Sequence, residues 1–85
     1  MYSKETVGEI METINSLSKT LVSYCNDRAQ LSEVEAFLLI ADNECSSELV
    51  EKANDLKKLV ESNIDLYEKL IELYCETLLL LSKRN

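Results

Sequence analysis

The chain has 85 residues, so it forms one domain at most, and chains of this size bury only about 60% of their unfolded surface when they fold alone. Hydrophobic residues make up 46% of the sequence, which is too many for a disordered chain despite the net charge of −7. The 16 acidic residues against 9 basic ones argue against direct binding of DNA, RNA or an anionic membrane, because phosphate contacts need clustered positive charge.

The residues that make turns are almost missing, which predicts an all-α protein. The chain has no proline, and Gly8 is its only glycine. The N-terminal segment lacks the apolar core of a signal peptide, and the longest apolar runs, residues 36–41 and 78–81, are far shorter than the roughly 20 residues that cross a bilayer. We therefore expect a single helical domain over residues 1–85, located in the cytoplasm and not bound to a membrane.

A first amphipathic helix is predicted over residues 4–27 or so. Its apolar stripe advances in steps of three and four residues, and only Arg28 interrupts it. Both Ser3 and Thr6 are plausible starts, and Thr6 with Glu9 has the spacing of a capping box. The stripe consists of Val7, Ile10, Ile14, Leu17, Leu21, Tyr24, Arg28 and Leu31.

The apolar stripe weakens near residues 26–28 and then shifts around the helix. Ser32 and Glu35 again have the spacing of a capping box, which predicts a second helix over residues 32–42 or so. Two alternatives remain open: three helices in total, or one first arm with a kink near residues 26–32. No glycine or proline forces a break there, which slightly favours continuity.

A polar cluster at residues 43–47 predicts that the chain reverses there, with Ser46 or Ser47 as the cap of the next helix. A long helix is then predicted over residues 48–82, because no helix breaker interrupts it. Its apolar positions span roughly 220° of the circumference from Leu56 onward, about twice the stripe of an ordinary surface helix. The four leucines at 78–81 point in nearly every direction, so one neighbouring helix cannot cover them all.

The two earlier segments, laid end to end, match the last helix in length, which predicts a long antiparallel helical hairpin. One arm covers only part of the apolar arc of the other and leaves about 100° exposed. We therefore predict that two hairpins pack head to tail about a two-fold axis as a homodimer with a four-helix bundle. The residues expected at this interface are Leu59, Leu66, Tyr67, Leu73, Tyr74, Leu78, Leu80, Leu81, Phe37 and Ile40.

Two polar residues, Asn63 and Thr77, interrupt the apolar arc of the last helix. An asparagine in a helical seam often fixes register and oligomeric state at some cost in stability. An asparagine bonded to backbone or water in a loosely packed layer is an equally good interpretation. Tyr67 and Tyr74 can anchor a partner, although such tyrosines are more often core residues whose hydroxyl groups reach solvent.

The sequence carries no pattern that predicts catalysis. It has no histidine, which removes the commonest general base and the commonest metal ligand. Four carboxylates of the last helix, Glu61, Asp65, Glu68 and Glu72, lie together on its polar face, where a solvated surface explains them better than a metal site does. We expect no enzyme, no cofactor, no metal and no small-molecule substrate.

Cys25, Cys45 and Cys75 are spaced neither as zinc ligands nor as a disulfide framework. We expect reduced thiols, with Cys25 and Cys75 serving as small core residues. A disulfide between subunits is the weaker alternative.

Three functions are compatible with these features. The first is a protein–protein interaction module of the adaptor, chaperone or antagonist type, which holds another helical protein through an apolar helix face. The second is an acidic regulator that occupies the basic surface of a nucleic-acid-binding protein. The third is an obligate subunit of a hetero-complex, in which a different protein covers the apolar arc.

Overall fold

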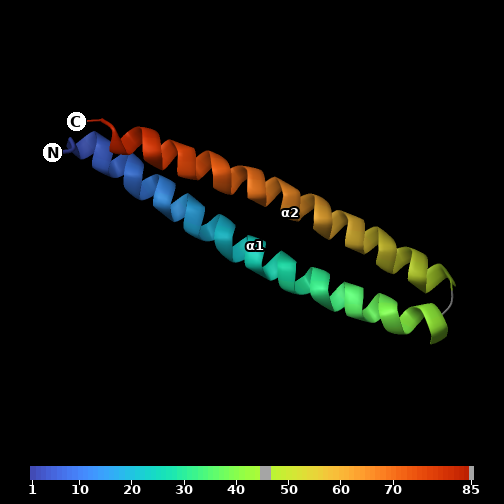
Figure 1. Cartoon of the computed structure of the whole chain (residues 1–85). Coiled ribbons are helices and arrows are strands. Elements are labelled where there is room, and N and C mark those ends of the chain that lie inside the picture. Colours follow the sequence, from blue (N-terminus) through green and yellow to red (C-terminus); the bar gives the residue numbers. More distant parts are fainter. Residues whose placement is uncertain (45–46, 85) are drawn as a thin grey trace.

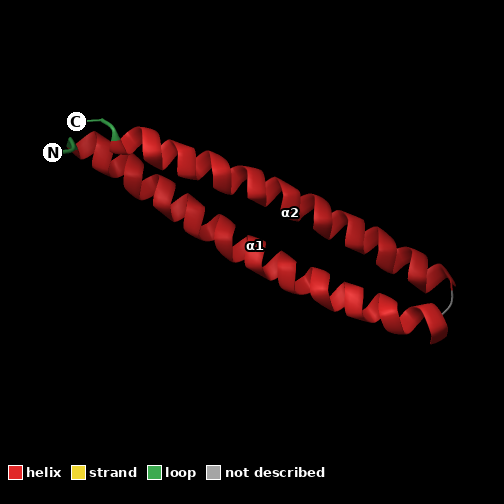
Figure 2. Cartoon of the chain, in the orientation of Figure 1, coloured by secondary structure: helices red, strands yellow, loops and turns green. Residues whose placement is uncertain are grey.

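The computed structural model describes residues 1–44 and 47–84, which form two long helices packed antiparallel as a hairpin. Helix α1 spans Lys4–Glu44 and α2 spans Ser47–Ser82. The helices run side by side over their whole length, and both termini lie at the same end (Figure 1). Short segments at the two termini are the described residues outside the helices (Figure 2). The molecule is a rod of 63 × 14 × 13 Å. The prediction of an all-α helical hairpin is therefore confirmed.

The first arm is one continuous helix, where the sequence predicted helices over residues 4–27 and 32–42 as one alternative. Ser32 does not cap a new helix, because its hydroxyl group donates a hydrogen bond to the carbonyl oxygen of Arg28, one turn earlier, at 3.3 Å. The guanidinium of Arg28 lies 5.8 Å from the ring centre of Tyr24, a second contact between successive turns. The residues around the shift in the apolar stripe thus stay in regular helical geometry.

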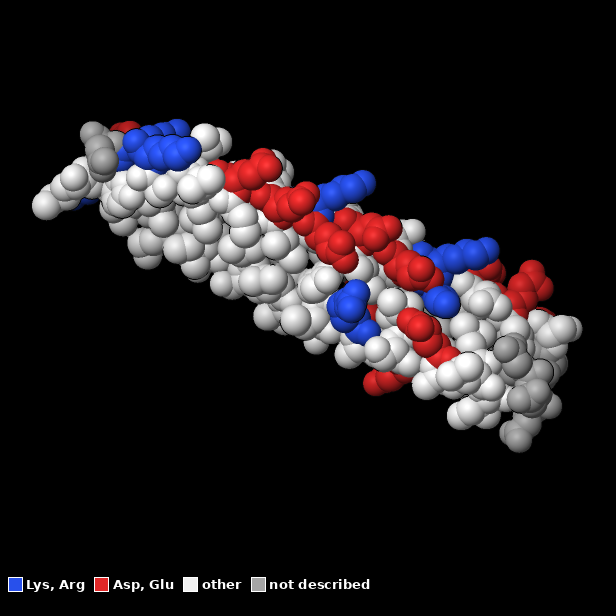
Figure 3. Space-filling model, viewed as in Figure 1, with Lys and Arg blue, Asp and Glu red and all other residues white. Residues whose placement is uncertain are grey.

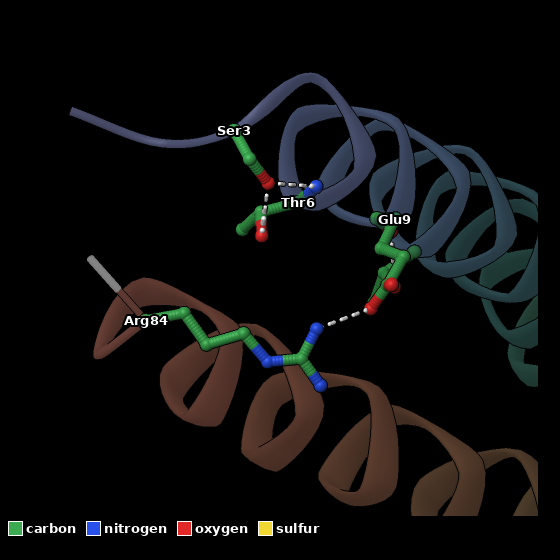
Figure 4. Close-up of polar contacts among 5 residues, drawn as sticks. Ser3, Thr6, Glu9 and Arg84 are labelled. Atoms are coloured by element: carbon green, nitrogen blue, oxygen red, sulfur yellow. Dashed lines mark hydrogen bonds and ion pairs between the residues drawn. The ribbon is translucent and has the colours of Figure 1, made fainter.

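Ser3 caps the N-terminus of α1, and the predicted capping box of Thr6 with Glu9 is wrong. The Ser3 hydroxyl oxygen accepts a hydrogen bond from the backbone N–H of Thr6 at 3.2 Å (Figure 4). Thr6 is consequently in the first turn of the helix, where its side chain is buried. Glu9 instead faces α2 and pairs with Arg84.

The predicted reversal at residues 43–47 falls partly outside the described residues, since Cys45 and Ser46 are not among them. Asn43 and Glu44 still belong to α1, and Ser47 is the first residue of α2. The proposed cap at Ser46 therefore lies outside the described part of the chain. The far end of α2 coincides with the predicted end at residue 82.

The two helices meet along what we name the hairpin seam, whose positions are all buried or half-buried and advance in steps of three and four residues. Its most buried members are Thr6, Ala41, Val60, Ile64 and Leu81. In α1 the hairpin seam consists of Thr6, Ile10, Thr13, Leu17, Thr20, Tyr24, Asp27, Leu31, Val34, Leu38 and Ala41. In α2 it consists of Val50, Ala53, Lys57, Val60, Ile64, Tyr67, Ile71, Tyr74, Leu78 and Leu81.

Half of the apolar stripe predicted for α1 does not face α2. Val7, Ile14 and Leu21 are exposed, and the threonine that directly precedes each of them takes the seam position instead. The other half of the stripe, which includes Ile10 and Leu17, is half-buried as expected. The larger apolar side chains of this half of α1 are thus left on the surface of the hairpin.

The prediction that Cys25 and Cys75 are core residues is wrong, because both thiols are free and exposed. Each cysteine directly follows a hairpin-seam position, Tyr24 in α1 and Tyr74 in α2. Successive residues advance about 100° around a helix, which turns both side chains away from the contact between the helices.

An exposed ion pair links the termini, with Arg84 Nη1 at 2.9 Å from Glu9 Oε2 (Figure 4). We expect Arg84→Ala to lower the free energy of unfolding by less than about 1 kcal/mol, because exposed pairs gain little over their hydration. Urea unfolding followed by circular dichroism measures this loss, and Lys83→Ala, at a neighbouring cation without an ion pair among the described residues, is the matched control. A loss several times larger than that of the control would show that the pair holds the helix ends together.

Candidate protein interface

A second apolar row runs along α2 beside the hairpin seam, and we name it the leucine seam. Each of its positions directly precedes a hairpin-seam position, so the leucine seam also advances in steps of three and four residues. All ten positions are exposed except the half-buried Leu70 and Thr77. The leucine seam consists of Leu49, Lys52, Leu56, Leu59, Asn63, Leu66, Leu70, Leu73, Thr77 and Leu80.

The four consecutive leucines at 78–81 are divided among three directions. Leu78 and Leu81 face α1, and Leu81 is only 4% exposed. Leu80 belongs to the leucine seam and is 67% exposed, while Leu79, 58% exposed, lies on the opposite side of α2. The hairpin therefore covers half of this run and leaves the other half in solvent.

The predicted interface residues separate in the same way. Leu59, Leu66, Leu73 and Leu80 are exposed on the leucine seam of the single hairpin. Tyr67, Tyr74 and Leu78 are half-buried in the hairpin seam, and Leu81 is buried there, because α1 already covers them. The predicted list omits Leu49, Leu56 and Leu70, although the step of three and four residues continues through all three.

The two sides of the hairpin differ because the helices are antiparallel. In this arrangement, residues that precede a seam position in either helix lie on one side, and residues that follow one lie on the other side. Phe37 and Leu56, which precede Leu38 and Lys57, line the same shallow groove. The leucine seam thus shares its side of the hairpin with residues of α1 that precede seam positions.

Near the turn, α1 adds apolar residues to the side of the leucine seam. Phe37 and Ile40, two of the predicted interface residues, are exposed there in the single hairpin. The groove on this side has a volume of about 360 Å³ and is lined by Glu33, Val34, Phe37, Leu49, Lys52, Ala53 and Leu56. The exposed apolar surface is therefore continuous from α2 onto α1 at this end of the rod.

In the middle of the rod the same side carries three side-chain amides, those of Asn26, Gln30 and Asn63. Gln30 lies three heptads after Glu9, and Asn63 lies three heptads before Arg84. Since Glu9 and Arg84 are paired, the same register brings Gln30 and Asn63 to one level of the hairpin. Both side chains are exposed in the single hairpin.

The opposite side of the hairpin is acidic along α2. We name Glu61, Asp65, Glu68 and Glu72 the acidic row; Figure 3 shows acidic side chains in a line along α2 on this side. The last three line a groove of about 620 Å³ together with Leu21, Tyr24, Lys69 and Ile71. The Tyr24 hydroxyl group donates a hydrogen bond to Glu68 Oε1 across this groove at 3.3 Å.

An uncharged surface lies over the half of α1 nearer the N-terminus, below the acidic row in Figure 3. Its exposed apolar members include Val7, Met11, Ile14 and Leu21, each of which follows a hairpin-seam position. This patch is shorter than the leucine seam, since Arg28, Ser32 and Glu35 continue the same spacing with polar side chains.

Residues 1–44 and 47–84 contain no group of three or more cysteines, aspartates or glutamates that could hold a metal ion. Within the same residues, neither helix has a stretch apolar enough to cross a membrane. The features of the described structure that can bind a partner are therefore the leucine seam, the amides beside it and the acidic row.

Comparison of the chain with protein-family models, with curated proteins and with solved structures gives no match.

Proposed function

We propose that this protein is a protein–protein interaction module that binds a helical partner through the leucine seam of α2, as an adaptor, chaperone or antagonist and without catalysis. The observation that carries the proposal is an uncovered row with heptad spacing, which runs along the whole of α2 beside the row that packs on α1. A helix that offers such a row is recognised by another helix, whose side chains fit between its own.

The amount of exposed apolar side chain supports a macromolecular partner. Leu56, Leu59, Leu66, Leu73 and Leu80 are all exposed on one face of one helix. Contiguous apolar surface of this kind is uncommon on monomeric proteins and marks interaction sites. Its linear shape, on a rod 63 Å long, suits a long helix and does not suit a small molecule, which needs a concave site.

A second candidate function uses the acidic row. Its carboxylates stand along one side of α2, so the protein can present a line of negative charge to the basic surface of a nucleic-acid-binding protein. In this function the leucine seam serves only to assemble the molecule.

Salt distinguishes the two functions. The tagged protein is used to capture proteins from a lysate of its own source at about 0.1 M and about 1 M salt, between which the Debye length falls from about 10 Å to about 3 Å. Binding through the leucine seam is expected to survive the higher salt, because apolar contacts are not screened. Complete loss of the captured proteins at high salt would contradict the proposal and favour the acidic row.

A double variant of the acidic row, Glu61→Gln with Asp65→Asn, is the matched control in the same capture. It leaves both seams intact and avoids Glu68, which accepts the hydrogen bond from Tyr24. Under the proposed function it captures the same proteins as the unchanged chain. Under the alternative it loses them even at low salt.

A further inference from the structure

We infer that the occupant of the leucine seam is a second copy of this chain, whose own leucine seam packs against it in antiparallel orientation about a two-fold axis. The inference rests on the proposed function, because it names the partner of the same surface. The first observation that carries it is the order of residues along the leucine seam, which is nearly the same when read in either direction.

The seam has its midpoint between Asn63 and Leu66. When an antiparallel second copy is centred there, all ten positions of the leucine seam face a position of the other seam. The N-terminal end of each leucine seam then lies against the C-terminal end of the other. It places the polar Lys52 opposite the polar Thr77 of the second copy. The remaining layers pair Leu49 with Leu80, Leu56 with Leu73, Leu59 with Leu70, and Asn63 with Leu66.

The neighbouring registers fit less well. A shift of one heptad in one direction leaves Leu49 and Lys52 beyond the end of the opposing α2, which stops at Ser82. A shift in the other direction sets Lys52 against Leu70 and leaves Leu80 beyond the end of the opposing α2. The centred register is the one in which the leucine seams overlap over their full length and the charged Lys52 faces no leucine.

The two-fold axis also passes the level at which Gln30 and Asn63 stand. Two copies bring four side-chain amides around the axis, where each amide offers both donors and an acceptor to the others. Buried polar groups need hydrogen-bond partners, and this register supplies them from equivalent residues. Asn63 is thus the device that fixes register, rather than a polar residue tolerated in a loose layer.

The exposed area agrees with a missing partner of this size. The hairpin exposes 6502 Å² for a mass of 9.7 kDa. A compact monomer of this mass exposes about 5,100 Å². The difference of about 1,400 Å² per chain exceeds the roughly 800 Å² that each partner gives to an interface of standard size, and it lies in the range of obligate dimers.

The test begins with the mass of the purified full chain in solution, measured by sedimentation equilibrium. We expect twice the chain mass of 9.7 kDa at micromolar concentration. A mass of one chain, or of three or more, overturns the inference. Such a result leaves the proposed function standing, because that function is tested separately by the capture of proteins at low and high salt.

The register is tested with a pair of charge reversals. The centred register brings Asp55, on the flank of the seam, to Glu76 of the second copy, and this repulsion occurs twice. We expect Glu76→Lys to convert both contacts to attraction and to lower the dissociation constant of the dimer roughly threefold to tenfold. Glu72→Lys makes the same change of net charge on the acidic row, away from the seam, and is expected to leave the constant nearly unchanged. Equal effects of the two variants overturn the centred register.

Discussion

Leu66→Glu is expected to separate the protein into single chains. Leu66 is 55% exposed in the isolated hairpin, so the glutamate is tolerated there as a surface residue. In the proposed dimer the same position stands beside the two-fold axis, where two carboxylates would be removed from water close to each other. We expect the dissociation constant to rise at least about a hundredfold, which corresponds to ~2.7 kcal/mol. Sedimentation equilibrium over a range of concentrations measures it.

Leu79→Glu is the matched control for this change. Leu79 is 58% exposed, slightly more than Leu66, but it lies on the side of α2 that faces away from the leucine seam. The control has the same charge and loses the same apolar side chain, so it is expected to keep the mass of the dimer. If both variants dissociate alike, the copies are held together by exposed apolar side chains in general and not by the leucine seam.

The long uncovered face of α2 could be predicted from the sequence because it follows from the angular width of the apolar positions around the helix. Two rows one residue apart, both with heptad spacing, occupy more of a helix than one neighbour can cover. Which row packs inside the hairpin could not be predicted from periodicity alone. Leu80 and Leu81 are chemically identical, and only the position of α1 decides that one is in solvent and the other buried.

The face that α1 turns towards α2 was predicted only in part. Its stripe contained residues such as Ile10 and Leu17, which belong to the row inside the hairpin, together with Ile14 and Leu21, which lie outside it. Two rows that lie one residue apart have the same spacing, so periodicity does not distinguish them. A prediction from hydrophobicity then takes the larger apolar side chain at each step, whichever row it belongs to. The hairpin instead buries Thr13 and Thr20 in part, and this places the larger side chains on the outer surface.

Hydrogen bonds explain why the helix starts predicted at Thr6 and Ser32 differ from the structure. Ser3 and Thr6 are both good caps by residue type, and so is Ser32. Only the folded structure shows that Ser3 accepts the bond from the first turn, and that the Ser32 hydroxyl group donates a hydrogen bond back to the carbonyl oxygen of Arg28 inside the helix. Capping residues in the middle of a long helix are therefore a weak signal of a break when no glycine or proline stands beside them.

Leu81→Ala and Leu80→Ala are expected to act on different steps of assembly, although the residues are adjacent. Removing the buried Leu81 side chain costs transfer free energy and leaves a cavity between α1 and α2, about 2–4 kcal/mol for such a change. Removing the exposed Leu80 side chain changes the folding of a single hairpin by no more than about 0.5 kcal/mol. In the proposed dimer, however, Leu80 is expected to pack at the end of the interface against Leu49 of the second copy.

Chain concentration separates these two effects in urea unfolding. Leu81→Ala is expected to lower the unfolding midpoint at every concentration, because the hairpin itself is weakened. Leu80→Ala is expected to match the unchanged chain at concentrations where the dimer has dissociated, and to fall below it only where the dimer forms, since binding stabilises the native state by mass action. Equal losses for both variants in the dilute sample would mean that Leu80 is already packed within one chain. The division of the four leucines between hairpin and partner would then be wrong.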